Sequence, residues 1–287
     1  MRLLICLLLL LTTHLSARIV ECRSTKNFEK EIKKDTLVLF DVDDTTITTS
    51  SYLGSKAFFN HLEVKIVQWK LPEKAVLSLI CKVIQKAAYL PAHKATPKLI
   101  AKLQEEGYLV FALTGRLKVA PWDPDFAQTT QKHLAAAGVD FMRTQLPSHF
   151  IDKKTPPSFA HGVIFSSWQP KGPVLKEFLQ NYKHRPAKVV FIDDDLESLK
   201  SVEASMKEMK IPFVGFHYRH CEKKARPFDI LTANIQLEHL MKKGVPLSDK
   251  AALEAKKKLL KKKRSINPDF YLDKLLSDLV EKQKTLR

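Results

Sequence analysis

The chain has 287 residues, of which 45% are hydrophobic, and it carries a formal net charge of +17 at pH 7. This composition can build a full hydrophobic core, so it excludes a largely disordered chain, and the length suits one domain with insertions or two small domains. So positive a chain attracts anionic partners such as phosphorylated metabolites, acidic membrane surfaces or nucleic acid, unless the charge only reflects a lysine-rich proteome.

The N-terminus predicts a secretory signal peptide over residues 1–17. A basic start at Met1-Arg2 is followed by an apolar block that ends at Leu11 and by the small residues Ser16 and Ala17, which is the usual order of such a signal. We therefore expect an exported protein, periplasmic or secreted, with anchoring by an uncleaved signal as the alternative. Export and the lack of a recognisable binding motif argue against a nucleic-acid partner.

Three cysteines follow the predicted signal, namely Cys22, Cys81 and Cys221. An odd number without Cys-x-x-Cys spacing predicts neither a disulfide framework nor a cysteine metal site. One bridge with one free thiol and a set of buried, unreactive thiols both remain open.

The first predicted strand of the core, Leu37–Phe40, ends directly on Asp41 and Asp43. Its apolar, β-rich sequence is typical of a buried strand, and open α/β sheets bind ligands beyond the carboxyl ends of their parallel strands. Two carboxylates that leave a strand end together repel each other unless a divalent cation or a shared proton offsets their charge. One of them can then attack phosphorus while the other handles the proton of the leaving group.

An insertion of residues 49–93 is expected next, because about sixty residues separate this motif from the next strand, far more than one crossover needs. The apolar stretch Ala75–Leu90 is long enough for a helix. A further helix should begin with Thr96 as its N-cap and Pro97 as its first residue, and end at Gly107.

The second strand, Tyr108–Leu113, ends on Thr114, Gly115 and Arg116. A threonine hydroxyl and the following backbone N–H groups suit a phosphate oxygen, and glycine permits close approach. Arg116 directly follows this threonine, so we consider it a candidate for a substrate contact.

Two further motifs complete the predicted site. Lys171 immediately precedes Gly172–Leu179, whose apolar spacing and Pro173 predict a helix, and an ammonium beside a helix N-terminus favours anion binding. The strand Lys188–Ile192 then ends on the acidic run Asp193–Asp195.

Aromatic residues flank these motifs. We expect those of the insertion to lie mainly in the core, with one or two in contact with substrate. The two tryptophans of the later loops are expected to pack structurally, with a place at the border of the cleft as the alternative for either. The residues are Tyr52, Phe58, Phe59 and Trp69 in the insertion, and Trp122 and Trp168 in the loops.

In this order, the four motifs resemble those of the haloacid dehalogenase (HAD) superfamily of phosphotransferases: Asp-x-Asp-x-Thr, a Thr after the second strand, a Lys, and a pair of acids after a later strand. The resemblance covers roughly residues 36–218, and the branches that look most similar are secreted, metal-dependent acid phosphatases. It implies an α/β fold with a Rossmann-like, doubly wound parallel sheet. Residues 35–48 and 94–240 would form this core, and residues 49–93 would form a small helical cap inserted after the first strand.

The resemblance also implies an activity, that of a magnesium-dependent phosphatase acting on small phosphomonoesters through a phospho-aspartyl intermediate. It gives Asp41 the role of nucleophile and Asp43 that of general acid and base. Phosphate-binding groups would be Thr114, Gly115 and Lys171, and Mg²⁺ would be held by Asp41, Asp43 through its backbone carbonyl, Asp193 and Asp194. The alternatives are a non-catalytic secreted binding protein that keeps the fold, and a phosphotransferase with an acceptor other than water.

A basic helical extension is predicted for residues 241–287. Its run Lys256–Arg264 contains seven cationic residues among nine. We expect a solvated helix that packs back on the core through Leu253, Leu259 and Leu260. Weak association of this run with an anionic membrane surface is the alternative.

Overall fold

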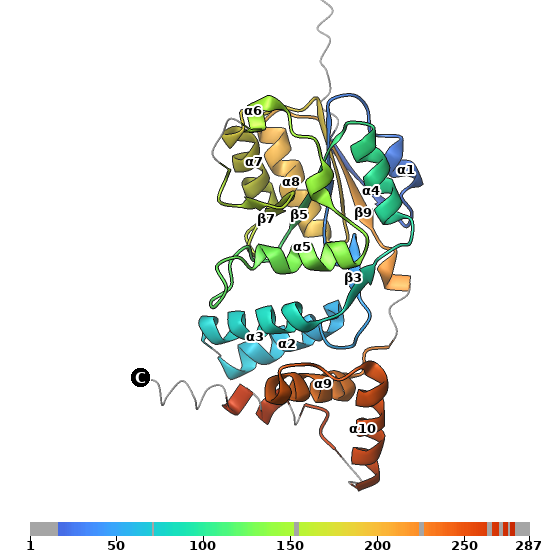
Figure 1. Cartoon of the computed structure of the whole chain (residues 1–287), viewed down its shortest axis with the longest axis vertical. Coiled ribbons are helices and arrows are strands. Elements are labelled where there is room, and N and C mark those ends of the chain that lie inside the picture. Colours follow the sequence, from blue (N-terminus) through green and yellow to red (C-terminus); the bar gives the residue numbers. More distant parts are fainter. Residues whose placement is uncertain are drawn as a thin grey trace, which may run out of the picture.

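The computed structural model describes residues 17–70, 72–151, 155–223, 227–262, 266–269, 272–274 and 276–278. Most of the predicted signal therefore lies outside the described residues, as do the last two residues of the basic run. Figure 1 shows three parts stacked along the long axis: a sheet with its helices, then α2 (Lys56–Trp69) and α3 (Glu73–Lys86), then α9 (Ile230–Lys243) and α10 (Asp249–Lys262).

A mostly parallel sheet forms the upper part, and in the described residues it has seven strands in the order β1-β9-β8-β2-β5-β7-β6. All neighbours run parallel except β6 and β7. The predicted buried strands occupy its centre, which confirms the expected α/β class with a parallel sheet. The strands are β1 (Ala17–Cys22), β2 (Thr36–Phe40), β5 (Leu109–Thr114), β6 (Phe159–Ala160), β7 (Val163–Phe165), β8 (Lys188–Asp193) and β9 (Phe213–Tyr218).

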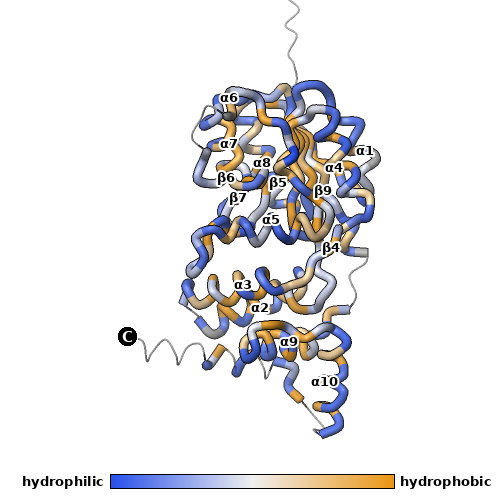
Figure 2. The backbone as a smooth tube through the Cα atoms, viewed as in Figure 1, coloured by the Kyte–Doolittle hydropathy of each residue, from blue (hydrophilic) through white to orange (hydrophobic). Residues whose placement is uncertain are grey.

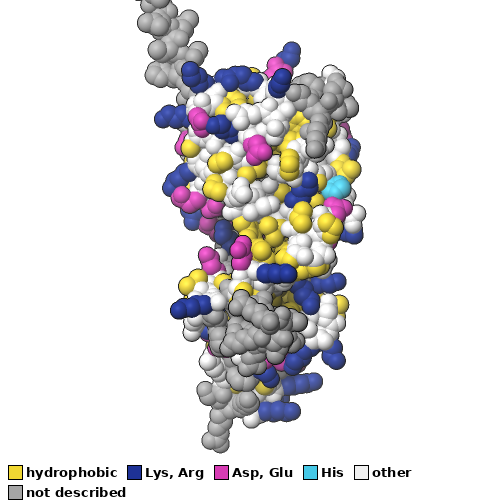
Figure 3. Space-filling model, turned by 90° about the vertical axis from the view of Figure 1, so that its left-hand side faces the viewer, with side chains coloured by type: hydrophobic (Ala, Val, Ile, Leu, Met, Phe, Trp, Pro, Cys, Tyr) yellow, Lys and Arg dark blue, Asp and Glu magenta, His cyan; other side chains and the backbone are white. Residues whose placement is uncertain are grey.

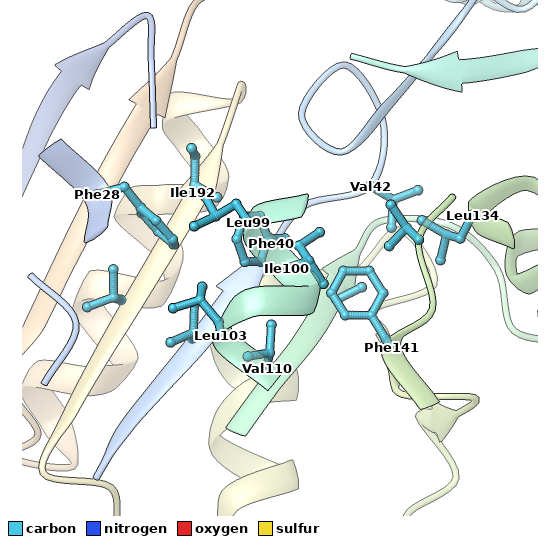
Figure 4. Packing of buried hydrophobic residues seen from close by; sticks show 14 of the residues in the cluster. Phe28, Phe40, Val42, Leu99, Ile100, Leu103, Val110, Leu134, Phe141 and Ile192 are labelled. Atoms are coloured by element: carbon cyan, nitrogen blue, oxygen red, sulfur yellow. The ribbon is translucent and has the colours of Figure 1, made fainter. Parts of the chain in front are cut away.

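Helices cover both faces of this sheet because alternate residues of each strand point to opposite sides. Val38 and Phe40 of β2 belong to one hydrophobic cluster, whereas Leu37 and Leu39 belong to another. Figure 4 shows the first cluster, in which the rings of Phe28 and Phe40 lie 5.1 Å apart. Its helices are α1 (Lys26–Glu29), α4 (Thr96–Glu105) and α5 (Ala127–Ala136), and those of the second are α7 (Lys171–Asn181) and α8 (Leu196–Glu208), with the short α6 (Ser148–Ile151).

One local expectation needs correction, and one alternative that the sequence left open is decided. Helix α4 begins at Thr96 itself, so its N-cap is Ala95, and the Thr96 hydroxyl makes no capping hydrogen bond. Cys22 and Cys81 are free thiols, and every bridge among the three described cysteines would need one of these two, so the bridge left open by the sequence is not formed. Cys22 and Cys81 are buried, and burial raises the pKa of each thiol to about 11, as expected for unreactive core cysteines.

The inserted helices α2 and α3 leave and re-enter the core through a two-stranded antiparallel ribbon, β3 (Ile47–Thr49) and β4 (Tyr89–Pro91). Their apolar sides pack against α9 and against later residues of the C-terminal segment; this cluster includes Phe58, Leu62, Leu79, Leu237 and Leu272. The C-terminal segment therefore completes the core of the insertion, and the boundary predicted at residue 240 falls within α9.

Helix α10 packs on α9 rather than on the sheet. Leu259 joins a small cluster with Leu231 and Ile235 of α9, while Leu260 is 46% exposed. The basic helix was expected to pack on the core of the sheet, but its apolar side chains pack against α9. Figure 2 shows α10 as mainly hydrophilic, in contrast to the hydrophobic strands of the sheet at the other end of the molecule. Within the described part of the chain, none of the helices has the length and apolar character needed to cross a bilayer.

Short 3-10 helices, η1 (Phe141–Arg143) and η2 (Cys221–Lys223), lie in the loops that connect these elements.

Candidate functional site

Three carboxylates meet where β2 and β8 end. These strands are parallel neighbours, and the N–H of Asp41 extends their ladder by donating to the carbonyl of Ile192 at 2.9 Å. Parallel strands that end together direct their following residues to one edge of the sheet. As a result, one carboxylate oxygen each of Asp41, Asp193 and Asp194 lies within 4.8 Å of the other two, and both Asp41 and Asp193 are buried.

Lys171 joins the first two of these acids. Its Nζ donates to Oδ1 of Asp41 at 2.6 Å and to Oδ2 of Asp193 at 2.7 Å, and the side chain is buried. The lysine is the first residue of α7, which packs closely on α8 at Gly172. A Cβ at Gly172 would lie 2.0 Å from the carbonyl oxygen of Ser201, so only glycine permits this approach and the resulting position of the ammonium.

Burial and mutual repulsion shape the titration of the cluster. Burial raises the pKa of Asp41 well above its ordinary value, although Lys171 opposes the shift. Burial also raises the pKa of Asp193 to about 6, again against the effect of Lys171. For Lys171 itself burial lowers the pKa, but Asp193 and Asp41 outweigh it and the net pKa is raised. The cluster therefore keeps its ammonium charged while it resists a full set of negative charges.

Asp43 lies at the other side of the site, where Arg116 binds its carboxylate. Arg116 donates from Nε and Nη2 to the two oxygens of Asp43 at 2.8 and 2.7 Å, and its own side chain is buried. The guanidinium lies 4.8 Å from the ring centre of Tyr89 and 3.1 Å from Nδ1 of His133. Such bidentate binding fixes the orientation of Asp43, whose side chain stays 49% exposed.

The remaining loop residues connect the strand ends with one another. Thr45 Oγ1 accepts a hydrogen bond from the N–H of Asp194 at 3.0 Å, which ties the β2 loop to the β8 loop. Thr114 Oγ1 accepts from the N–H of Arg116 at 3.2 Å, and Thr114 is buried. Asp195 accepts from the N–H of Ser198 as the N-cap of α8, so this acid serves the helix and not the cluster.

The inserted helices close the site from the opposite side. Lys56, at the start of α2, reaches across and donates to Oδ2 of Asp194 at 2.6 Å. The space between the insertion and the strand ends is a cleft of about 580 Å³. Figure 3 shows hydrophobic side chains gathered at mid-height on one face of the molecule, with acidic side chains beside them. The strand-end part of the cleft is lined by Asp41, Asp43, Asp44, Thr114, Gly115, Arg116, Lys171, Asp193 and Asp194, together with Trp168.

The donor set of the three-carboxylate cluster fits a hard divalent cation. It offers oxygen ligands alone, which suit Mg²⁺ rather than a metal that prefers nitrogen or sulfur. If all three carboxylates are ionised, they outnumber the two ammonium groups of Lys171 and Lys56 by one charge. A cation held there would offset this excess.

In the structure every site residue proposed from the sequence lines the same cleft, but these residues form two separate groups of contacts. Asp41, Asp193, Asp194 and Lys171 form one cluster, whereas Asp43 and Arg116 form a separate pair. Sequence reasoning missed Lys56, Tyr89 and His133, since nothing in their local patterns distinguishes them from ordinary surface or core residues. Both Trp122 and Trp168 are about half exposed, and Trp168 lines the cleft, which is the alternative that the sequence had left open for these tryptophans.

Comparisons with known proteins place the chain among relatives without an assigned activity. A family model described as "Protein of unknown function (DUF2608)" matches residues 21–253. A protein of Chlamydia trachomatis named "Putative outer membrane protein" is 25% identical over 269 residues, which cover 90% of this chain and 99% of that relative.

Two more distant or shorter similarities accompany it. A protein of Chlamydia muridarum with the same name is 30% identical over 126 residues, covering 43% of this chain and 44% of the relative. A Rickettsia prowazekii protein described as uncharacterized is 22% identical over 241 residues, covering 81% and 87% of the two chains. No solved structure matches the chain significantly.

Proposed function

The chain belongs to the DUF2608 family of unknown function, and from the geometry of its cleft we propose that it is a magnesium-dependent phosphatase of the HAD type. The observation that carries this proposal is the set of three carboxylates from two adjacent strand ends with Lys171 bound between Asp41 and Asp193. The desolvation of three acids gathered in one cleft is costly, and such clusters with raised pKa values are typical of functional sites.

Asp41 is the proposed nucleophile. Its carboxylate attacks the phosphorus atom of a phosphomonoester and forms a phospho-aspartyl group, while the bond from phosphorus to the leaving oxygen breaks. Lys171 binds Asp41 and lies beside the reacting group, where its charge stabilises the equatorial phosphoryl oxygens. Thr114 and the backbone N–H groups that follow it are the proposed partners of the remaining oxygens.

Asp43 carries the proton in both half-reactions. It protonates the departing alkoxide in the first step and, as a carboxylate, accepts a proton from the water that attacks phosphorus in the second, which releases inorganic phosphate and restores Asp41. Arg116 binds Asp43 and not the cluster, so in this scheme it acts as a positioning residue, whereas the sequence named it as a candidate substrate contact.

Asp41, Asp193, Asp194 and the backbone carbonyl of Asp43 are the proposed ligands of Mg²⁺. Bound there, the cation would supply charge stabilisation to the transferring phosphoryl group. Lys56 offsets the charge of Asp194 from the side of the insertion, which in this proposal is the cap of the HAD fold.

Export to the envelope is part of the proposal. It is supported by the predicted signal over residues 1–17 and by the names of the chlamydial relatives, which describe outer membrane proteins. An exported phosphatase would meet small phosphorylated substrates outside the cytoplasm.

The experiment is a screen of the purified protein for phosphate release from a panel of phosphomonoesters, with and without Mg²⁺. Asp41→Asn removes the proposed nucleophile and keeps its shape, so its turnover should fall to background. The matched control is Asp125→Asn, an exposed acid outside the cleft, which should keep the wild-type rate. Unchanged turnover in Asp41→Asn would exclude the covalent mechanism, and a lack of phosphate release from every ester would favour a binding protein that keeps the fold.

A further inference from the structure

We propose that the cleft selects phosphomonoesters whose leaving group is uncharged and apolar, an alkyl or aryl alcohol, rather than a sugar or a nucleotide. The inference rests on the proposed phosphatase function, because the acidic cluster supplies the phosphoryl half of the ligand. The evidence for this selectivity is the part of the cleft that lies opposite the acidic cluster.

The insertion presents an apolar wall to the acidic cluster. The side chains that line the cleft from α2 and α3 are mainly aliphatic or aromatic. Four of these side chains, Phe59, Ile66, Val76 and Ile80, are only partly buried and so keep some accessible surface, whereas Leu62 and Ile84 are buried. The wall consists of Phe59, Leu62, Ile66, Val76, Ile80 and Ile84.

Two aromatic side chains continue this surface towards the strand ends. Tyr89 lies beneath the insertion and stacks near Arg116, and burial raises the pKa of its hydroxyl, so the phenol stays neutral. Trp168 borders the cleft beside Gly115 and is 48% exposed. An apolar moiety attached to a phosphate at the cluster would therefore contact apolar surface from both directions.

Charges in the cleft disfavour an anionic leaving group. In the described part of the cleft lining the cations are Lys56, Arg116 and Lys171, and each is already paired with a carboxylate. Glu63 of α2 adds a negative charge to the wall. A second phosphate or a carboxylate on the substrate would find no cation of its own and would be repelled by Glu63.

The volume also fits a compact organic group. A cleft of about 580 Å³ lies within the range of small-molecule sites, which are mainly apolar with a few polar groups that fix orientation. Here the acidic cluster lies at one end, and the lining from α2 and α3 is mainly apolar, with Lys56, Asn60 and Glu63 as polar exceptions. This distribution suits an amphiphilic phosphoester.

The test measures binding independently of turnover. Full-length protein with Mg²⁺ is titrated calorimetrically with n-alkylphosphonates from methyl to octyl, which cannot be hydrolysed at a P–C bond. We expect the dissociation constant to fall about fourfold for each added methylene until the cleft is filled, because burial of each methylene adds roughly constant free energy. Phosphate release from the matching alkyl phosphates, from glucose 6-phosphate and from AMP is measured in parallel.

Two valine variants assign the contact to the wall. Val76 lines the cleft and belongs to none of the hydrophobic clusters, so Val76→Asn should weaken hexylphosphonate about tenfold and leave methylphosphonate unchanged. The same change at Val67 is the control, since Val67 is 73% exposed on α2 and does not line the cleft.

Each outcome decides one of the two proposals. Dissociation constants that do not change with chain length, a lack of binding by every phosphonate, or equal effects of the two variants would overturn the apolar selectivity. Chain-length dependence without phosphate release would leave the selectivity standing and refute the phosphatase. Phosphate release with a preference for glucose 6-phosphate or AMP would support the phosphatase and overturn the apolar selectivity.

Discussion

Replacement of Lys171 by methionine provides the sharpest test of the buried cluster. The substitution shortens the side chain by only one atom and removes its charge, so Asp41 and Asp193 lose the ammonium that lies 2.6 and 2.7 Å from them. At an effective dielectric constant of about 20, each contact is worth about 6 kcal/mol of Coulomb attraction. Desolvation of the ammonium and the two acids offsets most of this attraction, and breaking such a buried pair from one side typically costs about 3–5 kcal/mol.

We therefore expect Lys171→Met to lower the free energy of unfolding by about 3–5 kcal/mol at pH 7 without added metal. For a chain of this length that corresponds to a fall in Tm of roughly 6–10 °C. Urea and thermal unfolding followed by circular dichroism measure both quantities. The control is Lys176→Met on the same helix, which removes only a partly exposed ion pair with Glu208. Mg²⁺ should restore more stability to the variant than to the wild type, because it would replace the missing positive charge. A loss below about 1 kcal/mol would refute the view that Lys171 is the main counter-charge of Asp41 and Asp193.

Four further predictions follow from other parts of the structure. Asp43→Asn should reduce turnover by at least about 100-fold and keep the fold. With a substrate that has a good leaving group, trapped phosphoenzyme should be detectable by mass spectrometry. A wild-type rate would contradict the role of Asp43 in proton transfer. Burial and Arg116 lower the pKa of His133 to about 4, below the unfolded value of about 6.5, so its contribution to stability is complete above pH 6.5 and is lost as the pH falls towards 4. Between pH 7.5 and pH 5 this lowers the free energy of unfolding by about 2 kcal/mol. In urea unfolding, the free energy of unfolding of His133→Gln should therefore depend on pH less than that of the wild type, by the same amount. Equal pH dependence of the two proteins would count against the lowered pKa of His133. Leu237→Ala, a buried residue of α9 in the core of the insertion, should cost about 2–5 kcal/mol in urea unfolding, while Leu260→Ala at an exposed site should change stability by less than about 0.5 kcal/mol. Lys257→Glu on the exposed side of α10 should weaken co-sedimentation with anionic vesicles at low salt if the basic helix binds membranes; equal sedimentation of wild type and variant, or none by either, would remove α10 from the functional account.

The last of these tests uses a substitution because the structure argues against deletion of the C-terminal segment. Leu272 and Leu276 lie in the core of the insertion, and Lys65 of α2 forms ion pairs with Asp269 and Asp273 at 2.9 and 3.3 Å. Removal of these residues would expose the outer side of the insertion. A change in vesicle binding would then report on damaged packing as well as on the lost charges.

The sequence by itself determined the central strands and the order of the polar residues after them. Leu37–Phe40, Tyr108–Leu113 and Lys188–Ile192 could be identified because a strand buried on both faces must be apolar along its whole length. Their polar ends could be identified because that apolar pattern stops abruptly at Asp41, Thr114 and Asp193. Periodicity is a local signal, so it survives without knowledge of the rest of the chain.

Tertiary structure alone decided which of these groups touch. Local sequence does not show that Lys171 lies between Asp41 and Asp193 while Arg116 binds Asp43, because each pair is more than 20 residues apart along the chain. The edge strand β1, the contact of Lys56 with Asp194 and the packing of α9 on the inserted helices are equally non-local. Such contacts depend on how the elements fill space together, and the free energy that selects them comes from burial and charge pairing across the whole molecule.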